Sequence, residues 1–270
     1  MNLRGILRVI AVALSIGAAL WLFAAASAPA SEIRWRELKA TCLVAGLAVA
    51  FAQELLGTLI AQIALAAFGQ RAAFARLLAI VTAATSANSL VPVPAGIPAR
   101  LWLQQSLLGI PPAPATAAIG LELLAGYGVL GIFAALGALH FGVGVDIDVR
   151  YLAVALIATV AAVFPAWHWR RRLQERLLRV IAARPVPAFV AITIALNLVV
   201  IVLATLRLWL ILHAAGHTAA AYDLVAALCI ARVAGVASMI PMGLGSRDVT
   251  LTGLLALAGV PLPVALVAAA

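Results

Sequence analysis

The chain has 270 residues, of which 66% are hydrophobic and 10% are charged, and its mean hydropathy is +1.17. Soluble domains carry roughly a quarter charged residues, so this composition excludes an ordinary soluble enzyme or binding domain and indicates a chain embedded in lipid. The net charge of +9 does not indicate a nucleic-acid partner, because the arginines lie in short segments between apolar runs, where positive residues mark the cytoplasmic side of a membrane.

The apolar runs predict an all-α protein. Backbone groups in hydrocarbon must be paired within helices or a closed barrel, and the runs lack the period-two alternation of barrel strands. Five runs are near the roughly 20 residues that cross a bilayer. They cover 6–28, 40–68, 113–140, 151–167 and 187–215. The first run imitates a signal peptide, but it exceeds the usual apolar core of roughly 7–15 residues, so we interpret it as a retained span.

Two further apolar stretches, 77–91 and 224–240, end in similar Pro/Gly clusters. The first cluster reads Ser-Leu-Val-Pro and then Gly-Ile-Pro-Ala-Arg, and the second reads Ser-Met-Ile-Pro and then Gly-Leu-Gly-Ser-Arg. Each is followed by an apolar piece too short to cross alone, 101–110 and 249–258. Gly-Ile-Pro at 109–111 is echoed by Gly-Val-Pro at 259–261. An offset near 150 therefore predicts a tandem repeat, with repeat one at 1–141 and repeat two at 142–270.

We expect each interrupted stretch to dip to mid-membrane and return as a re-entrant hairpin. Each repeat then makes three full crossings, and this odd number inverts the second copy. The prediction is a polytopic transmembrane helical bundle of inverted repeats, each with a re-entrant hairpin broken by Pro and Gly. Repeat two has no counterpart of 113–140, so we expect it to lack its last helix through truncation.

The distribution of arginines orients this bundle in the bacterial inner membrane. Positive residues are more frequent in the segments that lie inside if the N-terminus is cytoplasmic. The segment 168–184 carries the largest basic cluster and is expected to be cytoplasmic. The segments 142–150 and 216–223 are expected to be external.

Arg100 and Arg247 occupy equivalent places, each just after a glycine turn at the start of a half-helix. The first N–H groups of a helix are unsatisfied and its N-terminal dipole end is positive, so the pair predicts a phosphate-sized anion site. The alternative is that each arginine reaches the interface or pairs with an acid, for example Arg247 with Asp248. The predicted substrate-binding residues are Arg100, Arg247, Asn88, Gly96, Gly243 and Gly245.

Further charged residues lie at predicted bilayer depth, where each costs on the order of 2.5–3.5 kcal/mol and is normally paired or functional. We interpret them as proton or ion carriers or as counter-charges. They are Glu54, Glu122, Asp248, Arg207 and Arg232. His213 and His217 stand four apart, but Gly216 is expected to end the helix between them. We therefore expect no metal and no cofactor.

The candidate polar residues and the Pro/Gly breaks form one ordered pattern along the chain. Asn88, Pro92, Gly96 and Arg100 are followed by Glu122, and then by Pro241, Gly243, Gly245 and Arg247-Asp248. The pattern resembles the transmembrane region of the bacterial lysylphosphatidylglycerol synthase/flippase family over nearly the whole chain. The chain departs from the family pattern in lacking the first acid near Ile97 and Pro98, in having Leu123 in place of arginine, and in having Asp248 in place of glutamate. No aminoacyl-transfer domain follows, so the resemblance implies lipid translocation or handling and not lipid synthesis.

The leading expectation is a flippase-like protein, not an enzyme, that handles an anionic lipid such as a phospholipid or a polyprenyl or glycolipid conjugate. Its expected partners are membrane lipids. One alternative is a hydrolase like undecaprenyl-diphosphate phosphatase, whose Pro-Gly-x-Ser-Arg turn the segment 241–247 resembles. That chemistry needs a carboxylate pair to hold a metal, and Glu54 has only glutamine beside it. The other alternative is an accessory subunit that works with enzymes of a glycolipid or hopanoid pathway.

Overall fold

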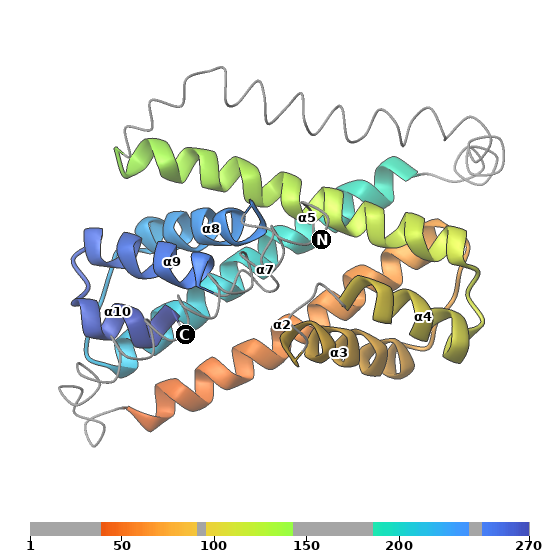
Figure 1. The fold of residues 1–270 in the computed structure, drawn as a ribbon, viewed down its shortest axis with the longest axis horizontal. Helices are drawn as coiled ribbons and strands as arrows, with labels where there is room; N and C mark the ends of the chain where they lie inside the picture. The colour runs from red at the N-terminus through yellow and green to blue at the C-terminus, as the bar shows by residue number, and fades with distance from the viewer. Residues whose placement is uncertain (1–38, 91–95, 143–185, 238–244, 270) are drawn as a thin grey trace, which may run out of the picture.

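The computed structural model describes residues 39–90, 96–142, 186–237 and 245–269. Within these ranges all regular structure is helical, which confirms the all-α prediction (Figure 1). The helices are α2 (Ala40–Ala67), α3 (Phe74–Leu90), α4 (Gly96–Leu108), α5 (Pro112–His140), α7 (Val186–Ala214), α8 (Ala221–Ala237), α9 (Ser246–Leu257) and α10 (Leu262–Ala269). The predicted spans 6–28 and 151–167, the basic segment 168–184, Gly243 and the side chain of Asn88 lie outside the described residues.

Three of the described helices are long and apolar enough to cross a membrane, namely Ala40–Ala67, Pro112–His140 and Phe189–Ala214. They correspond to the predicted spans 40–68, 113–140 and 187–215. Large apolar side chains cover their outer faces, with Leu47 72% exposed and Leu139 80% exposed. A surface of this kind is costly in water and suits contact with lipid acyl chains.

The two long helices α2 and α7 lie antiparallel at the centre of the molecule (Figure 1). The N–H of Lys39, before α2, donates to the carbonyl of Ala214 at the end of α7, at 3.2 Å. Halfway along, Gln53 Nε2 donates to the Val200 carbonyl at 3.4 Å. Gln53 and Val200 are 147 positions apart, the same offset that separates the last residues of the two helices, Ala67 and Ala214. Positions that the predicted repeat makes equivalent therefore meet where the helices cross.

The same order of helices recurs on either side of this crossing. The short helices α3 and α8 each have 17 residues, and both of their ends are 147 positions apart. In the first half, α3 and α5 each contact both α2 and α4. In the second half, α8 and α10 each contact both α7 and α9. We call these groups the α2–α5 lobe and the α7–α10 lobe. Their insertion into a membrane as re-entrant hairpins stays a prediction.

Each lobe has its own apolar core. In the α2–α5 lobe the core is built around Leu65, Leu77 and Ile110, and in the α7–α10 lobe it is built around Leu212, Leu224 and Leu255. A glycine with positive φ follows each central helix, Gly69 at 77° and Gly216 at 79°. Glycine adopts this left-handed conformation without steric cost and so ends the helix. The predicted helix end at Gly216 is confirmed.

The helix α5 joins the lobes by packing against α8 through a buried glycine, which gives a first testable prediction. A Cβ on Gly137 would lie 2.7 Å from Cβ and 2.9 Å from Cα of Ala226. Gly137→Ala should force the helices apart and lower the free energy of unfolding by roughly 1–3 kcal/mol. A Cβ on Gly131, in the same helix, would meet nothing within 4 Å. Gly131→Ala should therefore preserve or raise stability. Thermal unfolding of both variants in detergent tests this, and equal midpoints would contradict it.

Candidate arginine site

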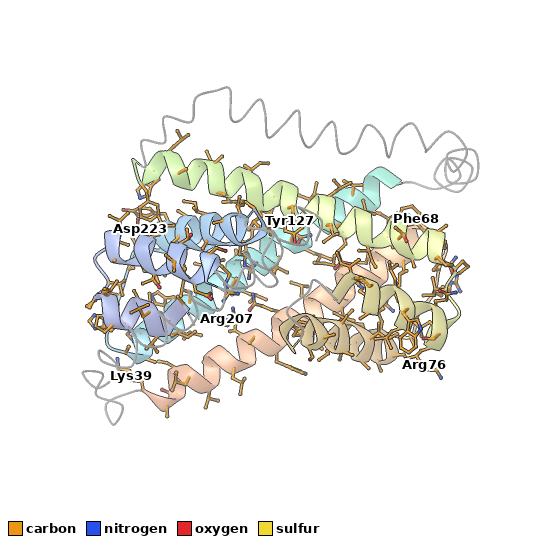
Figure 2. All side chains as sticks on the ribbon, viewed as in Figure 1. Lys39, Phe68, Arg76, Tyr127, Arg207 and Asp223 are labelled. Carbon is orange, nitrogen blue, oxygen red and sulfur yellow. The ribbon has the colours of Figure 1, made fainter. Side chains whose placement is uncertain are left out.

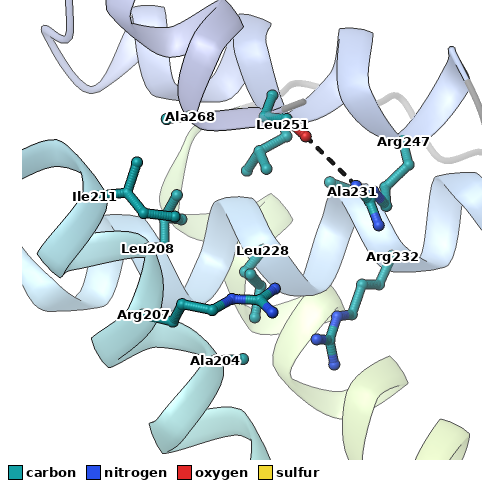
Figure 3. Close-up of a pocket in the computed structure, with 11 residues that line it drawn as sticks. Ala204, Arg207, Leu208, Ile211, Leu228, Ala231, Arg232, Arg247, Leu251 and Ala268 are labelled. Carbon is teal, nitrogen blue, oxygen red and sulfur yellow. Dashed lines mark hydrogen bonds between the residues drawn. The ribbon is translucent and has the colours of Figure 1, made fainter. Parts of the chain in front are cut away.

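Three arginines from three helices line one cavity in the α7–α10 lobe (Figure 3). They are Arg207 of α7, Arg232 of α8 and Arg247 in the first turn of α9. The cavity has a volume of about 60 Å³, and its other walls are apolar side chains that include Leu208, Leu228 and Leu251. Each guanidinium is close enough to repel at least one of the others electrostatically. We call the three residues the arginine cluster.

Helical spacing explains why these side chains share a cavity. Ala204, Leu208 and Ile211 lie on the face of α7 that carries Arg207, at intervals of three or four residues. Leu228 precedes Arg232 by one turn on α8 in the same way. The small residues Ala204 and Ala231 are almost completely buried and leave the space that the longer side chains line. Gly245, with φ of 85°, turns the chain into α9 and brings Arg247 to the cavity.

Only Arg247 of the cluster has a carboxylate partner among the described residues. Its Nε and Nη2 both lie 2.9 Å from Asp248 Oδ1, and its Nη2 also donates to the Ala269 carbonyl at 3.4 Å. No carboxylate in the described part of the chain lies within ion-pair distance of Arg207 or Arg232. Glu54 attracts Arg207 electrostatically from beyond that distance.

Two of the other acids of the described ranges have partners elsewhere, and Glu54 makes no ion pair with the cluster. These ranges contain Glu54, Glu122, Asp223 and Asp248. Glu122 pairs with Arg100, and Asp223 Oδ1 accepts a hydrogen bond from His140 Nε2 at 2.9 Å. Three guanidiniums at the cavity therefore face one contacting carboxylate, and the cluster carries an excess of positive charge.

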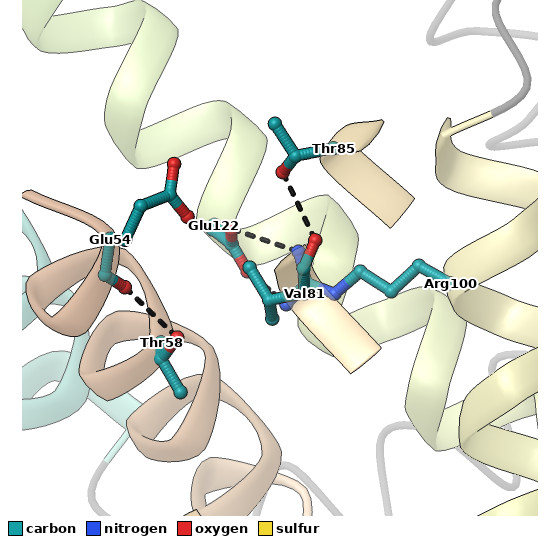
Figure 4. A network of polar contacts seen from close by, with 6 residues as sticks. All are labelled: Glu54, Thr58, Val81, Thr85, Arg100 and Glu122. Carbon is teal, nitrogen blue, oxygen red and sulfur yellow. Dashed lines mark hydrogen bonds and ion pairs between the residues drawn. The ribbon is translucent and has the colours of Figure 1, made fainter. Parts of the chain in front are cut away.

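Arg100 lies in a different environment, in a two-pronged ion pair with Glu122 of α5 (Figure 4). Its Nη1 donates to Glu122 Oε1 at 3.0 Å and its Nη2 to Oε2 at 2.7 Å. The two side chains are only 12% and 23% exposed. Glu54 also points from α2 toward this pair in Figure 4. Glu122 is thus the counter-charge of Arg100, one of the roles predicted for it.

The equivalent arginines Arg100 and Arg247 therefore have different partners. Each contacts a residue 22 positions later, but for Arg100 this is the carboxylate of Glu122 and for Arg247 it is the backbone carbonyl of Ala269. Arg100 does not line the cavity at Arg247. The structure thus brings Arg247 together with Arg207 and Arg232, and not with Arg100.

The predicted glycines lie at the helix starts. Gly96 is the first residue of α4, and Gly245 precedes α9. The Gly245 N–H donates to Asp248 Oδ2 at 3.4 Å, so one N–H at the start of α9 already has an acceptor within the chain. The positive charge available to a ligand in this lobe comes from the guanidiniums more than from the helix end.

His213, for which we expect no metal, lies next to the side chains of Trp209 and Lys39. Its ring stacks on Trp209 with centroids 5.0 Å apart, and its Nε2 lies 3.4 Å from Lys39 Nζ. Among the described residues, no three His, Cys, Asp or Glu side chains gather as a set that could hold a metal ion.

Sequence reasoning named all three members of the arginine cluster but did not place them together. It assigned Arg207 and Arg232 as counter-charges, which presumes acids nearby. The sequence from 186 to 269 contains only two acids, Asp223 and Asp248. That imbalance was the signal that could have pointed to an unneutralised site.

The model of the family described as lysylphosphatidylglycerol synthase TM region matches residues 8–270, nearly the whole chain. Searches of curated proteins and of solved structures gave no match.

Proposed function

Since the chain belongs to the lysylphosphatidylglycerol synthase transmembrane-region family, we propose that it translocates an anionic lipid, with the arginine cluster as the head-group site. Family membership and the three long apolar helices make it a membrane protein of a lipid-related family. The observation that carries the proposal is the convergence of Arg207, Arg232 and Arg247 on one cavity, where a single carboxylate of the described residues contacts them.

An unneutralised arginine inside a membrane protein requires an explanation. Charged groups at bilayer depth are costly, and they are normally paired or placed where a substrate passes. Arg232 lies partly buried in the arginine cluster, and no carboxylate in the described ranges pairs with it. Guanidinium groups bind phosphate oxygens through two parallel hydrogen bonds. An anionic head group would therefore supply the missing counter-charge and lower the free-energy cost of holding these charges at bilayer depth.

We propose that the protein acts as a transporter and not as an enzyme. Membrane lipids are its proposed partners. Glu54 attracts Arg207 without contacting it, so its carboxylate is the group that would compete with a head group for Arg207.

We further propose that the protein lies in the bacterial inner membrane with its N-terminus cytoplasmic. Single cysteines at Asp146 and Glu175, in a background without Cys42 and Cys229, test this orientation. Asp146→Cys should react with a membrane-impermeant thiol reagent in intact cells, whereas Glu175→Cys should react only after permeabilisation. The reverse pattern would show that the orientation is inverted.

The translocation proposal is tested with purified protein in liposomes that contain an anionic lipid labelled on an acyl chain. A membrane-impermeant quencher reaches only outer-leaflet label in protein-free vesicles. With the protein present, it should reach the label of both leaflets, with or without an imposed pH gradient. If no anionic lipid crosses faster than in protein-free vesicles under either condition, the proposed function is wrong.

A further inference from the structure

On the basis of the proposed translocation, we infer that the substrate is a lipid phosphomonoester, a lipid whose phosphate carries no further head-group substituent. The chemistry of the cavity at the arginine cluster leads to this class through its charge, its size and its apolar wall.

The charge of the cavity matches a dianion better than a monoanion. Of the three arginines, only Arg247 contacts a carboxylate within the described ranges, that of Asp248. A phosphodiester head group brings one negative charge, which leaves a guanidinium without a counter-charge. A phosphomonoester brings about −1.5 to −2 at neutral pH and presents three terminal oxygens. It can therefore neutralise both Arg207 and Arg232.

The size of the cavity also favours an unsubstituted phosphate. Its volume of about 60 Å³ accommodates roughly four to six water-sized groups, taking 10–15 Å³ for each. A phosphate group has four oxygens and fills this space. A glycerol, sugar or amino-acid substituent beyond the phosphate would not fit between the arginines as well and would be displaced toward the apolar wall or the open side of the cavity.

The walls of the cavity are the third observation. Leu208, Leu228 and Leu251 are nearly buried and line the same space as the arginines (Figure 3). They offer no hydrogen-bond partner. The hydroxyl or ammonium groups of a substituted head group would lie against these side chains without partners, which disfavours binding.

The test compares phosphatidic acid with phosphatidylglycerol, both labelled on the same acyl chain, in the same proteoliposomes. We expect phosphatidic acid to cross about tenfold faster or more, the effect expected when a polar group is left without a partner. Leu228→Ala enlarges the cavity and should raise the rate for phosphatidylglycerol relative to phosphatidic acid. Equal rates in the wild-type protein, or faster crossing of phosphatidylglycerol, would overturn the phosphomonoester inference and leave the translocation proposal standing.

Two further outcomes separate the inference from the proposed function. If neither lipid crosses faster than in protein-free vesicles, the translocation proposal fails and the inference fails with it. A parallel measurement follows uptake of radioactive inorganic phosphate into the same vesicles. Uptake of phosphate without crossing of phosphatidic acid would assign the cavity to the free ion and would overturn the lipid inference.

Discussion

Arg232→Gln is expected to lower the rate of anionic-lipid translocation by roughly tenfold to a hundredfold. The guanidinium would lose charge-assisted hydrogen bonds to a phosphate, which contribute about 1.5–3 kcal/mol each. The same change should not destabilise the protein. No carboxylate among the described residues pairs with Arg232, and removing its charge relieves repulsion from Arg207 and Arg247. The variant should therefore unfold at the wild-type temperature or above it.

The matched control is Arg76→Gln, which removes the same charge from an exposed position in the α2–α5 lobe, away from Arg207 (Figure 2). This variant should translocate at the wild-type rate. Translocation rates in proteoliposomes and unfolding temperatures in detergent are measured for both variants. If Arg232→Gln translocates like Arg76→Gln, or if it unfolds well below the wild-type protein, Arg232 has a structural role and not a binding role.

Arg100→Gln, unlike Arg232→Gln, should mainly lower the free energy of unfolding. It removes the only ion-pair partner that the described residues provide for Glu122. Breaking one side of a buried ion pair typically costs about 3–5 kcal/mol, because the remaining charge is left uncompensated. The partial exposure of Glu122, 23%, places the expected loss at the lower end of that range.

A double-mutant cycle separates the ion pair from other effects. Arg100→Gln/Glu122→Gln replaces two charges with two neutral amides and should recover most of the stability lost in Arg100→Gln. Arg247→Gln is the matched comparison, because Arg247 is 37% exposed beside Asp248. Its stability should change by no more than about 1 kcal/mol. A strictly additive cycle would contradict a coupled Arg100–Glu122 pair.

The long helices could be predicted from the sequence almost to the residue, because uninterrupted apolar runs have few alternatives in a membrane. The predicted span 40–68 is found as Ala40–Ala67. The short helices were placed less well. The piece predicted at 101–110 begins at Gly96, and the piece predicted at 249–258 begins at Ser246. Apolarity marks only the hydrophobic part of a helix, whereas a first turn also accepts proline and polar residues such as Pro98 and Asp248.

The partners of the arginines could not be predicted from the repeat. Equivalence in sequence suggested equivalent roles for Arg100 and Arg247, but partners come from neighbouring helices. Glu122 reaches Arg100 from α5, whereas the residue 22 positions after Arg247 is Ala269, which has no charged group. The arginine cluster depends on the packing of α7, α8 and α9 around one cavity, and no local spacing encodes that arrangement.

Native mass spectrometry of the protein purified from bacterial membranes tests most directly whether the arginine cluster holds an anionic lipid. The wild-type protein and Arg76→Gln should each retain one anionic lipid per chain at gentle activation. Arg207→Gln/Arg232→Gln should lose that lipid, because it removes the two guanidiniums of the cluster that have no carboxylate partner in the described part of the chain. If the double variant keeps the same lipid at the same occupancy, the cluster is not the head-group site.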